Sequence, residues 1–557
     1  MTTSESSVSD RPLSTAELFY LLYFCLMLAA KGLGQSEGQP LYDLCLAAAA
    51  LCFLAKLMLT RYTMFELLGT ILLLGMTMFV YLRTGERGIV FYMAMALGLK
   101  GVSLKRVFRT GAWLLSVCFL LMMALTQSGL IGDLFYVHHK DALGFTVRWS
   151  FGYTHPNVLH ITYLVLMALW LYVLPLTRKQ LRAVSVFFML GNLYVLLYSL
   201  SYTGFIVGTF YLFCNYYFTA SRPDSGLRRL ANALAGCLFP FCVLFSVAGP
   251  VILTGKLYEL ADKLVHHRFV LSNYFLTTEP VALFGHRLLT TPDATRSIDC
   301  SYTYLFVHLG VVFFAMFCLV YMAMILRCIR QNNGRTLAIL LGFALAGVTE
   351  PFLFNTSFKN ITFLLIGAYL FFLADRLSHR LPAFWRREIA LGVFGKIGSK
   401  EIIFSRRETA PIRKHEDQTD TFPNRNDKSV SVSDQKEDSA AARSLSRLLL
   451  FSCGAAFLAA MLYLLAAPRP SAVLIPSVYC TDGYESDPQL YTQEEIDALD
   501  SSVIVLSWNG SSEEMALFTG STPHLEFVRR TVSCGVWTWL AIFGAGHLLQ
   551  RKRTRHS

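Results

Sequence analysis

The sequence predicts an all-α, polytopic integral membrane protein with about twelve core transmembrane helices and about two more towards the C-terminus. The chain has 557 residues, of which 54% are hydrophobic and only 15% are charged, whereas soluble domains carry about 25% charged residues. The apolar residues gather in blocks of roughly 17–25 residues, the length that crosses about 30 Å of hydrocarbon. The polar residues 1–15 do not have the pattern of a cleaved signal peptide. We therefore expect a membrane-embedded fold.

Fourteen apolar blocks are expected to form the spans. The first twelve belong to a core of residues 16–375, and the last two form a C-terminal hairpin within residues 448–557. The expected spans are 16–34, 41–59, 64–82, 88–102, 108–127, 157–176, 183–200, 204–219, 231–253, 302–326, 336–349, 359–375, 448–467 and 532–549.

The positions of basic residues predict the orientation, because short loops rich in Lys and Arg stay in the cytoplasm. With alternating helices, the basic loops fall on one side together with the final "RKRTRHS", so both termini are expected in the cytoplasm. Three segments are then external: 128–156, 254–301 and the acidic 468–531. Residues 376–447 form a cytoplasmic linker, basic in its first half and expected to be disordered in its second half. Cys480 and Cys534 would both lie outside, where a disulfide is one possibility.

Four arginines break the orientation rule, because they lie in the two large external loops of the core. An anionic ligand would explain them, since a guanidinium donates two hydrogen bonds at once to phosphate. The alternative is an ordinary solvated loop, and Arg529 and Arg530 break the same rule without an evident function. The four are Arg148, Arg268, Arg287 and Arg296.

The stretch "RWSFGYTHPNVLH" (148–160) places polar groups at the start of the sixth span. Pro156 suits the first position of a helix, and this helix start would open outwards with free N–H groups and the positive end of its dipole. Arg148, Tyr153, His155 and Asn157 cluster there, which predicts an anion site. The alternative is that Thr154 and His155 only cap the helix while Asn157 bonds within its first turn.

The loop 254–301 begins with leucines at helical spacing over 256–275, which predicts an amphipathic helix at the membrane interface with Arg268 on it. Asp299 and Tyr302 begin the next span, where Asp299 is a candidate base, an orienter of Arg, or a helix N-cap. Glu350, near membrane depth, is a candidate site residue or an exposed turn residue.

Five stretches in this order resemble the bacterial O-antigen polymerase and O-antigen ligase superfamily, above all the capsular and exopolysaccharide repeat-unit polymerases. The resemblance covers about residues 16–375. The stretches are "RTGERGIVFYMAMALGLKGVSLKRVFR" (83–109), "RWSFGYTHPNVLH" (148–160), "HHRFVLSNYFL…LFGHRLL" (266–289), "DCSYTYLFVHLG" (299–310) and "TEPFLFN" (349–355).

This resemblance implies a C-type membrane glycosyltransferase in the bacterial plasma membrane, acting at the outer leaflet on glycans carried by polyprenyl diphosphate. The lipid-linked donor and acceptor and the bilayer would be its partners, with a chain-length regulator and a flippase as possible others and no nucleic acid. It implies no cofactor and no metal, because the first external loop has only the separated acids Glu37 and Asp43.

The resemblance also assigns residues. Arg148 and Arg268 match the family's two arginines and are expected to be catalytic, together with His155 and Asp299. The expected substrate-binding residues are Asn157, Tyr153, Tyr302, Arg287 and Glu350.

The sequence departs from the family pattern at two places. Tyr202 stands in "SYTG" (201–204) where an Arg is common, and His266 and His267 precede Arg268 where small residues are usual. Both departures concern contact with the substrate rather than the fold.

In the expected reaction, an acceptor hydroxyl attacks the anomeric carbon of the donor glycan and the diphosphate leaves, stabilised by Arg148 and Arg268. Either His155 or Asp299 would be the base. Three other readings stay open: a ligase that transfers finished glycan to another acceptor, a transporter of lipid-linked glycan, and a non-enzymatic assembly or sensor protein.

Overall fold

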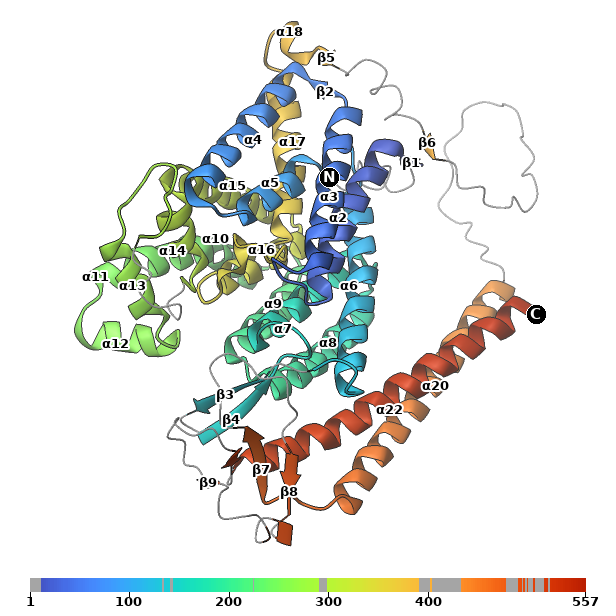
Figure 1. Ribbon diagram of the computed structural model, residues 1–557. Helices are drawn as coiled ribbons and strands as arrows, with labels where there is room; N and C mark the ends of the chain where they lie inside the picture. The colour runs from blue at the N-terminus through green and yellow to red at the C-terminus, as the bar shows by residue number, and fades with distance from the viewer. Residues whose placement is uncertain are drawn as a thin grey trace. The chain divides into compact units, whose positions relative to one another are not determined.

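The chain forms two compact units in the computed structural model (Figure 1). The first unit comprises Met1–Leu134 and Trp149–Ile403, and the second comprises Phe135–Arg148 and Phe404–Ser557. The described residues are 12–132, 135–140, 144–223, 225–289, 298–389, 401–402, 432–476, 489–492, 494–495, 498, 504–505, 515–518 and 521–556.

The first unit is built from helices, with two very short strand pairs. Strand β1 (Leu13–Ser14) pairs with β6 (Glu401–Ile402), and β2 (Tyr62–Thr63) pairs with β5 (Glu388–Ile389), both antiparallel. The helices are α2 (Thr15–Gly32), α3 (Pro40–Leu59), α4 (Met64–Thr84), α5 (Gly88–Leu97), α6 (Leu104–Gln127), α7 (Pro156–Val173), α8 (Arg178–Ser199), α9 (Tyr202–Ala220), α10 (Gly226–Val247), α11 (Gly249–Ile252), α12 (Gly255–Leu264), α13 (Arg268–Thr278), α14 (Ser301–Tyr304), α15 (Val311–Arg330), α16 (Gly334–Ala346), α17 (Thr362–Ser378) and α18 (Ala383–Arg386).

Among the described residues, nine helices are long and apolar enough to cross a membrane: α2, α3, α4, α6, α7, α8, α10, α15 and α22 (Ser521–His556). A mostly helical membrane protein is therefore what the structure supports. The finer count of twelve core and two C-terminal spans stays a prediction. Some of the expected spans fall on shorter apolar helices, among them α5 and α16.

Local sequence explains where several helices begin. Thr63 and Glu66 form a reciprocal capping box at the start of α4, and Thr177 and Gln180 do so for α8. Pro156 is the first residue of α7, as the sequence predicted. Helix α7 packs against α6, α8, α9 and α16 and is buried along most of its length, so it forms the centre of the first unit.

The expected continuous span over 302–326 is wrong, because the helix is broken near its start. Helix α14 passes into a π-helical turn (Leu305–Leu309), and Gly310 then separates this turn from α15. Gly310 has φ 97° and ψ 160°, a conformation that essentially only glycine adopts. Residues 282 and 286 form main-chain hydrogen bonds on either side of this break. Val311 N–H donates to Ala282 O at 3.1 Å, and His286 N–H donates to His308 O at 3.3 Å.

The amphipathic helix expected over 256–275 is also divided in two. Helices α12 and α13 are separated by His266 and His267, which have φ of 52° and 63°. The leucines that predicted the amphipathic pattern on α12, Leu257, Leu260 and Leu264, are exposed on its surface.

The second unit combines two long helices with small sheets. Strands β3 (Phe135–Lys140) and β4 (Gly144–Trp149) pair with each other, and Trp149, the last residue of β4, is counted with the first unit. A four-stranded sheet has the order β8-β7-β10-β9, formed by β7 (Ala472–Pro476), β8 (Gln489–Tyr491), β9 (Ile504–Val505) and β10 (Met515–Phe518). Helices α20 (Val432–Ala466) and α22 pack along each other. Helix α20 therefore begins inside the segment expected to be disordered to residue 447.

A buried arginine joins the β3–β4 hairpin to α22 within the second unit. Arg529 is 1% exposed, forms an ion pair with Glu526, and donates from Nη2 to Val147 O at 2.6 Å. The sequence predicts an external loop of the core at residues 135–148, whereas the contacts of this segment group it with the C-terminal module.

Gly310→Ala should destabilise the first unit by about 2 kcal/mol or more, because a Cβ at this position would lie 2.3 Å from Gly285 N. Thermal unfolding of the detergent-solubilised protein measures the change. Gly75→Ala in α4 is the control, because a Cβ there meets no atom of the described residues within 4 Å. Equal stability of the two variants would contradict a glycine-dependent break.

Candidate functional site

The carboxylate of Glu350 is the centre of a polar cluster inside the first unit. Glu350 follows α16, and its own N–H donates to Ala346 O at 3.0 Å. It precedes the 3-10 turn Pro351–Leu353. The residue is 7% exposed, so the alternative of an exposed turn residue is wrong. A buried carboxylate needs partners, and Glu350 has several.

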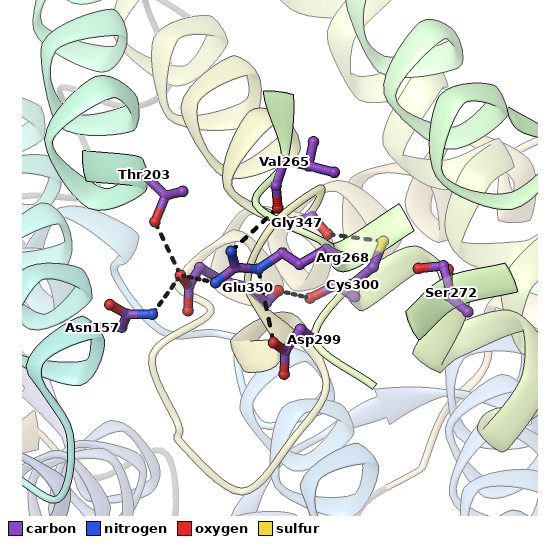
Figure 2. Close-up of polar contacts among 11 residues, drawn as sticks. Asn157, Thr203, Val265, Arg268, Ser272, Asp299, Cys300, Gly347 and Glu350 are labelled. Atoms are coloured by element: carbon purple, nitrogen blue, oxygen red, sulfur yellow. Dashed lines mark hydrogen bonds and ion pairs between the residues drawn. The ribbon is translucent and has the colours of Figure 1, made fainter. Parts of the chain in front are cut away.

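Three side chains converge on one oxygen of this carboxylate, as Figure 2 shows. Asn157 Nδ2 donates to Oε1 at 3.1 Å, and Thr203 Oγ1 donates to the same atom at 3.3 Å. Arg268 Nη2 lies 3.5 Å from Oε1 and forms an ion pair with it. Each partner stands in the first turn of a different helix: Asn157 on α7, Thr203 on α9 and Arg268 on α13. The positive dipole ends of three helices therefore meet at one place.

Arg268 lies between two carboxylates. Its Nε is 3.9 Å from Asp299 Oδ2, and its Nη1 donates to Val265 O at 3.3 Å. The side chain is only 13% exposed. Nε is buried and makes no hydrogen bond to any residue that the structure describes. The guanidinium is thus held in place without using all of its donors.

Asp299 is the most open of the three charged groups, with a side chain 32% exposed against 9% for Glu350. It immediately precedes Cys300, which is the N-cap of α14 and makes no side-chain capping bond. The N-cap alternative for Asp299 is therefore wrong. The main chain after Asp299 is tied to the Glu350 segment, since Ser301 N–H donates to Gly347 O at 2.9 Å and Ser301 Oγ donates to Glu350 O.

His155 caps α7, as the alternative of a helix-capping role predicts. Its Nδ1 accepts the N–H of Asn157 at 3.1 Å. An imidazole nitrogen that accepts a hydrogen bond carries no proton, so a neutral His155 has its proton on Nε2. The capping bond therefore makes Nε2 a donor rather than an acceptor.

Three other expected site residues, Tyr153, Tyr302 and Arg287, do not join this cluster. Tyr153 and Tyr302 are fully buried, and their hydroxyl groups donate to Gly32 O at 3.0 Å and to Ala344 O at 2.7 Å. Arg287 is exposed and lies beside Gly85. The structure thus brings together Asn157, Arg268, Asp299 and Glu350 of the expected set.

Arg148 belongs to the second unit, at the end of β4, where it is 7% exposed. Its neighbour Trp149 belongs to the first unit. Arg296 and Cys480 lie outside the described residues. Cys534 donates from its thiol to Ala459 O at 3.8 Å within the second unit.

Sequence reasoning missed Thr203 as a ligand of Glu350. Thr203 lies in "SYTG" (201–204), a stretch just after α8 that the sequence singles out only for Tyr202. Tyr202 and His266, which both differ from the residues usual in the resembling family, lie close together, with ring centroids 6.5 Å apart.

Within the described ranges, no group of three or more His, Cys, Asp or Glu side chains is placed to hold a metal ion. The two carboxylates of the cluster both form ion pairs with the Arg268 guanidinium. The arrangement can instead hold a polar or anionic ligand near Arg268, with Asp299 available to exchange a proton.

Comparison of the chain with protein-family models, with curated proteins and with solved structures found no match.

A second, half-buried carboxylate lies between α4 and α5. Glu86 accepts from Gly88 N–H at 2.7 Å and from the hydroxyl of Tyr304 on α14. Burial raises the pKa of Glu86 above its ordinary value of 4.5, against the opposing effect of these two hydrogen bonds. Folding therefore favours the protonated form of this carboxyl.

Glu350→Ala should destabilise the protein by about 3 kcal/mol, because removing one partner of a buried pair leaves the other charge uncompensated. Thermal unfolding of the purified protein measures this. Glu37→Ala is the matched control, since Glu37 pairs with Arg87 at 3.9 Å with both side chains more than 40% exposed, and such pairs contribute less than about 1 kcal/mol. A loss no larger for Glu350→Ala than for Glu37→Ala would contradict the central role of Glu350.

The Glu86 carboxyl should make stability fall as pH rises. A carboxyl with a raised pKa binds more protons when folded, so its contribution is present below the ordinary value of 4.5 and is lost as pH rises through the folded pKa. The stability of the native protein minus that of Glu86→Gln should therefore decrease as pH rises above 4.5. Chemical unfolding at several pH values measures the difference, and an increase over this range would refute the assignment.

Proposed function

We propose that the protein is a membrane glycosyltransferase that joins polyprenyl-diphosphate-linked oligosaccharide repeat units into a surface polysaccharide at the outer leaflet of a bacterial plasma membrane. The observation that carries the proposal is Arg268, held between Glu350 and Asp299 where three helix N-termini meet. The order of motifs in the sequence supplies the substrate class, and the cluster supplies a chemistry that fits it.

The reaction needs positive charge at the leaving group. As the acceptor hydroxyl forms its bond to the anomeric carbon, the bond to the diphosphate oxygen breaks and negative charge develops on that oxygen. Donors fixed in advance at this position stabilise the transition state without reorganisation. Arg268 is fixed by its two ion pairs and by Val265 O, and the starts of α7, α9 and α13 add partial positive charge. Arg148 is the second arginine of the proposal, on the basis of the family resemblance.

Asp299 is the better candidate for the base. It is more exposed than Glu350, so an acceptor hydroxyl can reach it. His155 uses Nδ1 for the helix cap, so its Nε2–H is suited to donating a hydrogen bond to a phosphate oxygen. We assign proton removal to Asp299 and orientation of the diphosphate to His155. Asn157 and Glu350 hold the helix starts around them.

Arg268→Ala should lower polymer formation by about 100-fold or more, because it would remove a preorganised charge at the leaving group. Arg148→Ala should have an effect of similar size, as the family resemblance implies. Polysaccharide from a deletion strain complemented with each variant measures the effect, with protein level in the membrane measured in parallel. Lys263→Ala is the matched control, because it removes an exposed positive charge from α12, close to Arg268 in sequence, and should leave polymer unchanged.

The deletion strain also separates the two kinds of glycan joining. Accumulation of single repeat units indicates a lost polymerase, whereas full-length polymer left on its lipid carrier indicates a lost ligase. Long polymer made by the Arg268→Ala variant would overturn the role given to Arg268.

A further inference from the structure

The turn that presents Arg268 is held by one buried carboxylate. Asp262, on the last turn of α12, has a side chain 10% exposed. Its Oδ1 accepts the N–H of Val270 at 3.1 Å, its Oδ2 lies 2.8 Å from His267 Nδ1, and its main-chain oxygen accepts the N–H of His267 at 3.0 Å. Arg268 therefore lies between two residues that are both bonded to Asp262.

The backbone of this turn is strained. His266 and His267 have φ of 52° and 63°, in the left-handed region where a residue with a side chain costs about 1–3 kcal/mol. Two such residues in succession persist only when the surrounding structure fixes them. The bond between Asp262 and Val270 spans this strained pair, since Asp262 lies on α12 and Val270 on α13.

The two contacts of the Asp262 carboxylate contribute unequally to the stability of the turn. The His267 side chain is 85% exposed, and an ion pair with such an exposed partner contributes little. The bond to Val270 N–H is part-buried and satisfies one of the free N–H groups in the first turn of α13. The carboxylate oxygen that faces Val270 is therefore the more important of the two.

We propose that Asp262 is a positioning residue of the glycan-joining site, which fixes the main chain on both sides of Arg268 so that the guanidinium stays between Glu350 and Asp299. The inference rests on the proposed function, because it gives Arg268 the role of stabilising the leaving group. Without Asp262 the strained turn can relax, and the first residue of α13 moves with it. A misplacement of about 1 Å at a reacting group can cost about 100-fold in rate.

The test compares Asp262→Ala with Asp262→Asn in glycan joining by the purified full-length protein. Asp262→Ala should lower kcat by about 10- to 100-fold and change KM for the lipid-linked substrate by less than about threefold, since the contact it disturbs acts in the transition state. Asp262→Asn should stay within about threefold of the native kcat, because an amide oxygen still accepts from Val270 N–H. Glu259→Gln, an exposed acid one turn earlier on α12, is the matched control and should leave both constants unchanged.

A double-mutant cycle separates positioning from a general loss of structure. In an Arg268→Lys background, Asp262→Ala should lower the remaining activity by less than about twofold, because residues that act as a unit are not additive. An equal loss in both backgrounds would overturn the proposal. So would a native kcat for Asp262→Ala.

Hydrogen exchange gives a readout that does not depend on the reaction. Asp262→Ala should speed exchange of the Val270 amide by at least about tenfold relative to Glu259→Gln, while amides in the middle of α7 stay unchanged. Unchanged exchange at Val270 would refute the proposal that Asp262 holds this turn in place. Faster exchange at Val270 in a protein that joins no glycans would agree with that role of Asp262 and would refute the proposed function instead.

Discussion

The carboxylate of Glu350 is the constraint on which the arrangement of the first unit depends. A buried negative charge is costly unless hydrogen-bond donors and a cation surround it. Here the partners come from the beginnings of α7, α9 and α13, which lie far apart in the chain. Satisfying one side chain therefore fixes where three helices start. The same requirement brings Arg268 to a defined place, with its Nε 3.9 Å from Asp299 Oδ2.

Breaks in regular structure supply the groups around this carboxylate. Arg268 follows the strained turn between α12 and α13, Asp299 precedes the short helix α14, and Glu350 precedes a 3-10 turn. In a membrane protein, irregular backbone persists where other parts of the protein satisfy its polar groups. The bonds from Ser301 to Gly347 and Glu350 do this for two of the breaks. The charged groups of this cluster therefore stand where helices are interrupted.

The sequence alone predicts the helical fold class and many residues of the candidate site, because hydrophobic blocks and helix-start signals are local. Pro156 was placed correctly at the start of its helix, and Asn157, Arg268, Asp299 and Glu350 were all among the expected site residues. The contacts of Asn157, Thr203 and Arg268 with Glu350 were not predictable, because they depend on packing between distant helices. The break at Gly310 was missed because a single glycine inside an apolar run does not reveal its φ. The break at His266 and His267 was missed because neither residue is a usual helix breaker, and the helical spacing of leucines continues on both sides.

The hairpin formed by β3 and β4 has a consequence for how the protein is made. Val147 and its partner Arg529 are separated by 382 residues, and at roughly 5–20 residues per second a ribosome needs about 20–80 s to cover that distance. The edges of the hairpin stay without their final neighbours during this interval, and exposed strand edges invite pairing with other chains. Folding of the second unit can therefore be completed only after α22 has been synthesised. Until then, chaperones and proteases can act on the β3–β4 hairpin. A stop codon late in the reading frame would leave an early segment of the chain permanently unfinished.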